Sequence, residues 1–321
     1  MPDADEEAWL AAVPARFRRP LGLAAQGELP PNVALMHVLM EAAEEAEARR
    51  VLSEAAQAAG EGSGAAIRAL LALWDTHPQA FTTEKAVLAR VVHDAPSQGD
   101  GTVRALAAAF DQAACAAPEA SVALYTLGSP ALMRAATEEI VAVLRRWGVV
   151  GRKRAMLEIG CGIGRFEEAL APELSLAVGI DVSQAMLRTA RERCAGLADA
   201  AFVQTSGLDL AAFRDASFDL VLAVDSFPYL VQAGPELPAR HVEEAARVLR
   251  PGGDLVILNL SYRGDLDQDR RDLAALAAEA FEIRRNGVQG EFRLWDGAAF
   301  HLSARKRGLK RRTSEGWRSA G

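Results

Sequence analysis

Three glycines spaced two residues apart could form a ligand-binding loop. Gly160, Gly162 and Gly164 follow a short apolar run and precede a segment with helical character. Glycine lets the backbone turn sharply and lets a ligand approach without a Cβ atom in the way. The amides of such a loop and of the next helix face the ligand. By itself the loop indicates only a nucleotide-like ligand, because NAD and FAD enzymes have one too.

An acidic residue ends the next predicted strand. Asp181 follows the apolar run 174–180 and comes 17 residues after Gly164. A carboxylate in this position can accept hydrogen bonds from both hydroxyls of a ribose. The structural alternatives are a helix N-cap or a turn residue at the strand end. Together with the glycine loop, Asp181 favours a nucleoside ligand.

The segments that position these residues alternate between strand and helix from residue 150 onward. Short apolar runs predict buried parallel strands, at 155–159, 174–180, 201–204, 218–224 and 254–258. Two last strands, at 281–288 and 298–303, have no crossover helix between them and should pair antiparallel. The prediction is an α/β fold: a doubly wound, seven-stranded Rossmann-like sheet with an antiparallel last strand.

The residues before 150 show helical periodicity and almost no strand pattern. Residues 31–59 predict one long helix or two abutting helices, and the Glu-Gly-Ser-Gly stretch at 61–64 predicts a break. We therefore expect an all-helical N-terminal domain over residues 1–128, before a sheet domain over 129–304. The helical domain would serve as a cap over the site or as a homodimer interface.

Composition narrows the class of protein. A net charge of −7 argues against a dedicated nucleic-acid binder. Three scattered cysteines predict neither a disulfide framework nor a metal site. We expect a soluble cytoplasmic protein, because no signal-like start and no membrane-length apolar stretch is present. Residues 305–321 hold seven Lys or Arg, which predicts a solvated, flexible tail or a contact with an acidic partner or anionic substrate.

Four segments together resemble class I methyltransferases that depend on S-adenosylmethionine (SAM). They are 157–166, 178–183, 217–221 and 245–253, in the order and spacing of that family. The resemblance covers roughly residues 125–305. It implies a SAM-dependent methyltransferase that transfers a methyl group to a small-molecule acceptor by in-line displacement.

The resemblance also implies which residues bind SAM. The three glycines would wrap its methionine part and Asp181 its ribose, while Tyr125 would close the pocket rather than merely pack in a turn. Ser-Gly-Leu at 206–208 stands where many members have Gly-Asp-Ala, so Asp209 or a backbone carbonyl would meet the adenine amino group. The full set is Tyr125, Glu158, Gly160, Cys161, Gly162, Gly164, Asp181, Val182, Met186, Ser206, Gly207, Leu208, Val224 and Asp225.

Methyl transfer mainly requires alignment of the reacting atoms and exclusion of water. A general base is needed only if the acceptor is protonated. The candidates are Asp225, Tyr229 and His301, with a partly buried strand histidine as the alternative for His301. Residues 225–229 match the N-P-P-Y motif of amino-group methyltransferases poorly, so Tyr229 is expected as a pocket wall. The other four histidines, at 37, 77, 93 and 241, are expected to be structural.

Two other functions stay open at this point. A nicotinamide-dependent oxidoreductase is disfavoured by the G-x-G-x-G spacing and by the reversed last strand. A catalytically silent scaffold or regulator is disfavoured by the complete set of cofactor residues. The motifs hold no information on whether oxygen, nitrogen or carbon receives the methyl group.

Overall fold

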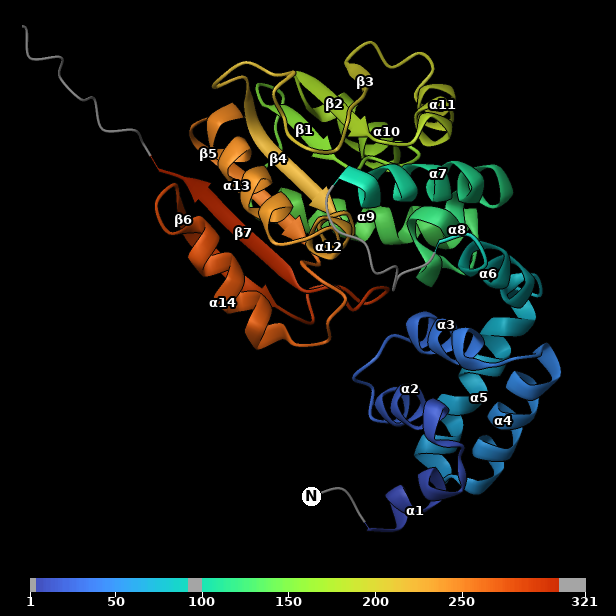
Figure 1. The fold of residues 1–321 in the computed structure, drawn as a ribbon. Coiled ribbons are helices and arrows are strands. Elements are labelled where there is room, and N and C mark those ends of the chain that lie inside the picture. The colour runs from blue at the N-terminus through green and yellow to red at the C-terminus, as the bar shows by residue number, and fades with distance from the viewer. Residues whose placement is uncertain (1–3, 92–99, 306–321) are drawn as a thin grey trace, which may run out of the picture.

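The computed structural model describes residues 4–91 and 100–305 and shows a lobe of helices beside a sheet domain (Figure 1). Apart from Arg305, the predicted basic tail lies outside the described residues. Among the described helices, none is both long and apolar enough to cross a membrane.

The sheet has seven strands in the order β3-β2-β1-β4-β5-β7-β6. The first five strands pair in parallel, whereas β7 runs antiparallel to both β5 and β6. This confirms the predicted fold class. The bounds are β1 Ala155–Ile159, β2 Leu176–Asp181, β3 Ala200–Gln204, β4 Phe218–Val224, β5 Leu249–Leu258, β6 Phe281–Val288 and β7 Ala299–Ala304.

Helices cover both faces of the sheet, because its central strands are apolar on both sides. Ser183 caps α11 as expected, since its side chain accepts a hydrogen bond from the Met186 amide. The helices of this domain are α9 Pro130–Arg146, α10 Arg165–Leu170, α11 Gln184–Arg193, α12 Phe227–Gln232, α13 Glu236–Val248 and α14 Leu266–Ala277.

The N-terminal part is helical. Residues 31–59, for which the sequence predicts one long helix or two abutting ones, form two helices. These are α3 and α4, separated at residues 42–44. The bounds are α1 Ala4–Ala12, α2 Ala15–Ala25, α3 Pro31–Glu41, α4 Glu45–Ala58, α5 Glu61–Thr76, α6 Ala80–Leu88, α7 Asp100–Ala116 and α8 Pro118–Val122, followed by the 3₁₀ turn η1 Leu124–Thr126.

The predicted break lies two residues earlier, at 59–60 between α4 and α5, because residues 61–64 form the first turn of α5. A Cβ atom at Gly64 would lie 3.0 Å from the carbonyl oxygen of Ala56 in α4. The glycine therefore serves the close approach of two helices rather than a loop.

Two polar contacts fasten the N-terminal helices to the sheet domain. From α3, the buried Asn32 donates hydrogen bonds of 2.8 Å to the carbonyl oxygens of Tyr125 and Leu294. From α7, Asp111 accepts from the hydroxyl of Ser183 at 2.6 Å and from the amide of Ala185 at 2.9 Å. The helices are thus held against the carboxyl ends of the parallel strands.

Replacing Asn32 by Ala should destabilise the fold, because it removes both hydrogen bonds and leaves two carbonyls unpaired. We expect a loss of about 2 kcal/mol in the free energy of unfolding, measured by urea denaturation. The exposed Gln26 gives a matched control, and Q26A should change stability by less than about 0.5 kcal/mol. If N32A and Q26A were equally stable, Asn32 would not fasten the two parts.

Candidate active site

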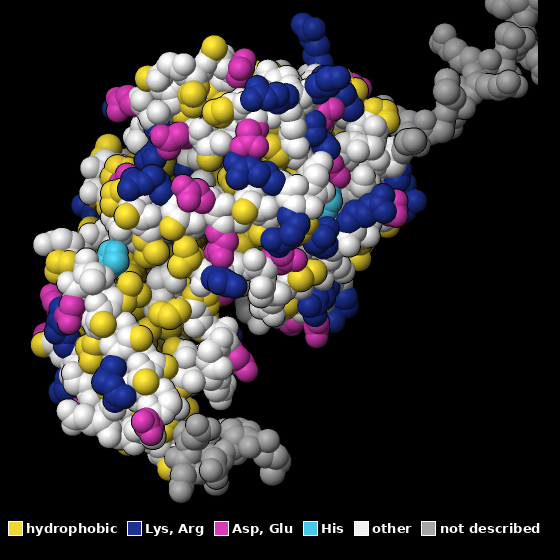
Figure 2. Space-filling view, turned by 180° about the vertical axis from the view of Figure 1, so that it is seen from behind, with side chains coloured by type: hydrophobic (Ala, Val, Ile, Leu, Met, Phe, Trp, Pro, Cys, Tyr) yellow, Lys and Arg dark blue, Asp and Glu magenta, His cyan; other side chains and the backbone are white. Residues whose placement is uncertain are grey.

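A cavity of about 530 Å³ lies between the carboxyl ends of the strands and the N-terminal helices. The glycine loop after β1 and the ends of β2, β4 and β5 form its floor, and residues of α3, α6, α7 and α8 form its opposite wall. Figure 2 shows hydrophobic side chains gathered where the two lobes meet. Ligands of doubly wound sheets bind at this edge.

Most residues predicted to form the site line this one cavity. They are Tyr125, Glu158, Gly160, Cys161, Gly162, Asp181, Val182, Met186, Gly207, Val224, Asp225 and Tyr229. Four others do not line it. Ser206 and Leu208 flank the lining Gly207, Gly164 is the N-cap of α10, and His301 lies on β7.

The glycine loop has a backbone that side chains rarely tolerate. Gly160, Gly162 and Gly164 have φ angles of 71°, 53° and 75°. A Cβ atom at Gly160 would lie 2.5 Å from that of Ser226 after β4, and one at Gly162 would lie 2.6 Å from Cγ1 of Val122 in α8. The loop is therefore enclosed between the sheet and the N-terminal region.

Asp181 holds this loop in place. One carboxylate oxygen accepts a 2.9 Å hydrogen bond from the Gly162 amide, and the other accepts a 2.8 Å bond from the Ser183 amide. Burial raises the pKa of Asp181, and these amides oppose the rise. Asp181 therefore stabilises the turn at the end of β2. Each carboxylate oxygen has a further lone pair, so Asp181 can also accept hydrogen bonds from ligand hydroxyls.

Two buried carboxyl groups, Glu158 on β1 and Glu167 on α10, lie beneath the loop. Burial raises the pKa of both groups, to about 7 for Glu167. Glu167 raises the pKa of Glu158 further, whereas the side-chain interaction with Glu158 lowers the pKa of Glu167. Such a pair holds one proton between two carboxyl groups near neutral pH. Oε2 of Glu158 has no hydrogen-bond partner among the described residues, and Glu158 lines the cavity. This oxygen can therefore accept a hydrogen bond from a ligand group.

Replacing Glu167 by Gln should remove a pH dependence of stability. Because the folded-state pKa lies above the ordinary 4.5, at about 7, the native protein loses stability as the pH rises through this range. The glutamine has no proton to lose, so at pH 8 E167Q should be more stable than the wild type by about 2 kcal/mol. Urea unfolding at a series of pH values measures this. The exposed neighbour gives the control E168Q, which should keep the wild-type slope, and an unchanged slope in E167Q would contradict the pair.

Arg165 is a cavity residue that the sequence motif does not single out. Its side chain is buried, lines the cavity and donates a 3.2 Å hydrogen bond to the Tyr125 hydroxyl. Its guanidinium also lies 4.6 Å from the ring centre of Phe166. Among the described residues it makes no ion pair. A cation at a helix N-terminus opposes the helix dipole, which is the signal that could have marked it.

The ends of β4 and β5 bring together Asp225 and Asn259. Both have left-handed backbones, with φ angles of 57° and 71°. Oδ1 of Asp225 accepts hydrogen bonds from the side-chain amide of Asn259 at 2.9 Å and from the Tyr262 hydroxyl at 3.2 Å. Burial raises the pKa of Asp225 to about 6. Strained non-glycine residues are common at functional sites, so this cluster is a candidate catalytic centre.

All three tyrosines of the chain line the cavity. Tyr229 meets the rings of Phe110 and Tyr262 edge-on, with centroids 5.0 and 5.7 Å apart. Tyr125 stacks on Trp295 at 5.7 Å. In a chain with only 6% aromatic residues, this concentration gives the cavity an aromatic wall.

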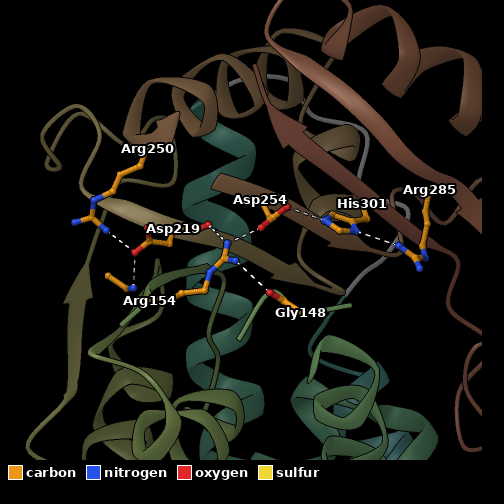
Figure 3. A network of polar contacts seen from close by, with 8 residues as sticks. Gly148, Arg154, Asp219, Arg250, Asp254, Arg285 and His301 are labelled. Carbon is orange, nitrogen blue, oxygen red and sulfur yellow. Dashed lines mark hydrogen bonds and ion pairs between the residues drawn. The ribbon is translucent and has the colours of Figure 1, made fainter. Parts of the chain in front are cut away.

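His301 differs from the other two candidate bases, because it lies away from the cavity in a polar network (Figure 3). Its ring nitrogens contact Asp254 at 2.9 Å and Arg285 at 3.2 Å, and the ring stacks on Trp147. Asp254 also binds Arg154. These contacts and the position outside the cavity fit the alternative for His301, a buried strand residue that ties β7 to β5.

The profile of a family described as "Methyltransferase domain" matches residues 157–257. The matched residues are therefore a methyltransferase domain, and they contain most of the segments that resemble class I SAM-dependent enzymes. The matched segment runs from the glycine loop to the end of β5 and so contains most of the cavity floor. The N-terminal helices and the β6–β7 segment, which supply the other walls, lie outside it.

The chain is also similar in sequence to curated methyltransferases. The chain is 33% identical over 156 residues to a demethylmenaquinone methyltransferase of Clavibacter sepedonicus, which covers 49% of the chain and 58% of that protein. It is 33% identical over 129 residues to the methyltransferase GfsG of Streptomyces halstedii, which covers 39% of the chain and 43% of the relative. The chain thus spans about half the length of these relatives.

A solved structure shares the fold. It is phosphoethanolamine N-methyltransferase 1 of Haemonchus contortus, in complex with phosphoethanolamine and S-adenosylhomocysteine. The TM-score is 0.50 at 14% identity, and the match covers 64% of this chain and 49% of that one.

Proposed function

We propose that this protein transfers a methyl group from SAM to a small-molecule acceptor in the cavity. The observation that carries the proposal is the convergence of the glycine loop, Asp181, Glu158 and Arg165 on one cavity at the carboxyl edge of the sheet. Neither the oxidoreductase nor the silent scaffold has an observation in its favour, since the relatives are methyltransferases.

The residues present fit the polar groups of SAM. The unpartnered Oε2 of Glu158 would accept from its ammonium group, and the guanidinium of Arg165 would pair with its carboxylate. Asp181 would accept from the ribose hydroxyls. Apolar walls formed by Val182 and Met186 would lie beside the adenine.

When bound, SAM supplies an electrophilic methyl group on a cationic sulfonium. The chain's own contribution is to orient the acceptor and to exclude water, and the N-terminal helices cover the cavity for this purpose. Asp225, at the end of β4, would lie near the sulfonium and is the candidate to take a proton from the acceptor. Tyr229 is the second candidate, with a pKa that burial raises and that favours the protonated hydroxyl as a hydrogen-bond donor.

A small-molecule acceptor is favoured because helices enclose the cavity from the side opposite the sheet. The N-terminal helices, over residues 1–128 as the sequence predicts, would then be a cap on the methyltransferase domain at 129–304. Dimerisation through these helices and a cytoplasmic location stay predictions.

Arg165→Met should weaken SAM binding, because methionine fills the space of the side chain but cannot pair with a carboxylate. We expect the Kd to rise by about thirtyfold, which corresponds to about 2 kcal/mol for a charged hydrogen bond. Isothermal calorimetry measures it. Arg188→Met replaces an exposed arginine on α11 and should leave the Kd unchanged. If the wild-type protein did not bind SAM at millimolar concentration, the proposed function would be wrong.

Asp225→Asn should distinguish SAM from its neutral product, S-adenosylhomocysteine. A carboxylate near the sulfonium attracts only the cationic form, so we expect about tenfold weaker SAM binding and about twofold or less for the product. In the wild type, SAM affinity should rise with pH as Asp225 ionises through its pKa of about 6. Calorimetry with both ligands between pH 5 and 7.5 measures both effects. Equal losses for SAM and product would exclude this position for Asp225.

A further inference from the structure

The charges that line the cavity are unbalanced toward the acidic side. Among the described lining residues, four carry carboxyl groups, Glu158, Asp181, Asp225 and Asp296, and only Arg165 is a permanent cation. Glu158 and Glu167 share one proton near neutral pH and so count as one charge. This inference rests on the proposed function, in which the ammonium group of SAM contacts Glu158, its ribose hydroxyls contact Asp181 and its carboxylate contacts Arg165. Its sulfonium then faces two remaining carboxylates, Asp225 and Asp296. The ribose hydroxyls are neutral and leave the charge of Asp181 unbalanced, so two negative charges remain, one of them beside the acceptor.

Asp296 and His37 come from two segments outside the family match and meet at this cavity. Asp296, which is exposed, belongs to the segment between β6 and β7, and His37 lies on α3. Asn32 holds these two segments together, since it bonds to the carbonyl of Leu294, two residues before Asp296. Neighbouring Trp295 stacks on Tyr125. The contacts of Asn32 and Trp295 therefore position the segments that carry Asp296 and His37.

Asp296 is close enough to affect the groups around it. Burial lowers the pKa of His37, and the charge of Asp296 opposes this shift. Burial raises the pKa of Asp225, to which the charge of Asp296 adds. The imidazole of His37 is thereby kept mainly neutral at pH 7, so that it can accept a hydrogen bond.

We propose that the acceptor is an apolar amine, whose ammonium group lies between Asp225 and Asp296 and donates a hydrogen bond to His37. The aromatic wall formed by Tyr229, Tyr262 and Trp295 adds the ring faces that cations favour. An anionic acceptor would meet two carboxylates, at a cost in free energy. For this acceptor His37, which the sequence predicts to be structural, would replace Asp225 as the base. It would take the proton that an ammonium must lose before its nitrogen lone pair can react, while Asp225 stays ionised.

The opposite wall determines the rest of the acceptor. Met36 and Met40 lie one turn apart on α3, Val87 lies on α6, and Val91 follows three residues after the end of α6. Methionine side chains adapt to irregular apolar shapes. The body of the amine is therefore hydrophobic, with the nitrogen at its polar end.

The test uses the full chain saturated with S-adenosylhomocysteine and three probes that share one hydrocarbon skeleton: phenylbutylamine, phenylbutanol and phenylbutyrate. We expect the amine to bind about tenfold more tightly than the alcohol or the acid. Asp296→Asn should weaken amine binding by about fivefold, because Asp296 is partly in solvent, and should leave the alcohol unchanged. The exposed Asp199 supplies the matched control D199N, which should bind all three as the wild type does.

Three binding results would overturn the inference: equal binding of the three probes, no binding of the amine at millimolar concentration, or amine binding that D296N does not affect. With SAM in place of the product, the bound amine should gain an N-methyl group detectable by mass spectrometry, and an unmethylated amine would contradict its assignment as acceptor. Binding of S-adenosylhomocysteine is measured first by calorimetry. Its failure would refute the proposed function, whereas its success without an amine preference would refute this inference alone.

Discussion

The site depends on the close approach of the glycine loop to its neighbours on both sides. Positive φ angles bring the loop backbone against Ser226 on one side and Val122 on the other, at distances that exclude any Cβ atom. The carboxylate of Asp181 then fixes the loop from the end of β2. Because the loop borders both the sheet and the N-terminal helices, its geometry sets where the cavity begins.

The N-terminal helices form one wall of the cavity. A Cβ atom at Gly207 would lie 2.9 Å from Cγ1 of Val103, so α7 closes the side of the cavity predicted for adenine. Asp111 and Asn32 anchor α7 and α3 to the sheet domain by hydrogen bonds to Ser183, Ala185 and two backbone carbonyls. The segment that matches the family, 157–257, supplies the floor of the cavity, and the N-terminal helices supply its opposite wall.

Local patterns predicted the parts of the fold that local chemistry decides. Short apolar runs marked the strands, and the missing crossover marked the reversed β7. The Ser183 cap followed from residue type and position. The pattern misplaced the break between α4 and α5 by two residues, because Gly64 permits a contact between these helices that no local rule contains.

The acceptor side could not be predicted in the same way. Asn259, Tyr262, His37 and Asp296 carry no motif, and only the packing of separate segments brings them to one cavity. The side of β7 on which His301 lies could not be predicted for a related reason. Both faces of β7 are buried, so the period of two could not tell which face holds the site and which holds the network with Asp254.

A crystal structure of the full chain with S-adenosylhomocysteine tests the central claim most directly. We expect the ligand to lie between the glycine loop and α7–α8, with its ribose at Asp181, its carboxylate at Arg165 and its ammonium at Glu158. Tyr125 and the N-terminal helices should cover it. A ligand bound elsewhere, or bound in this edge of the sheet with the N-terminal helices displaced from it, would contradict the claim that both parts of the chain form one site.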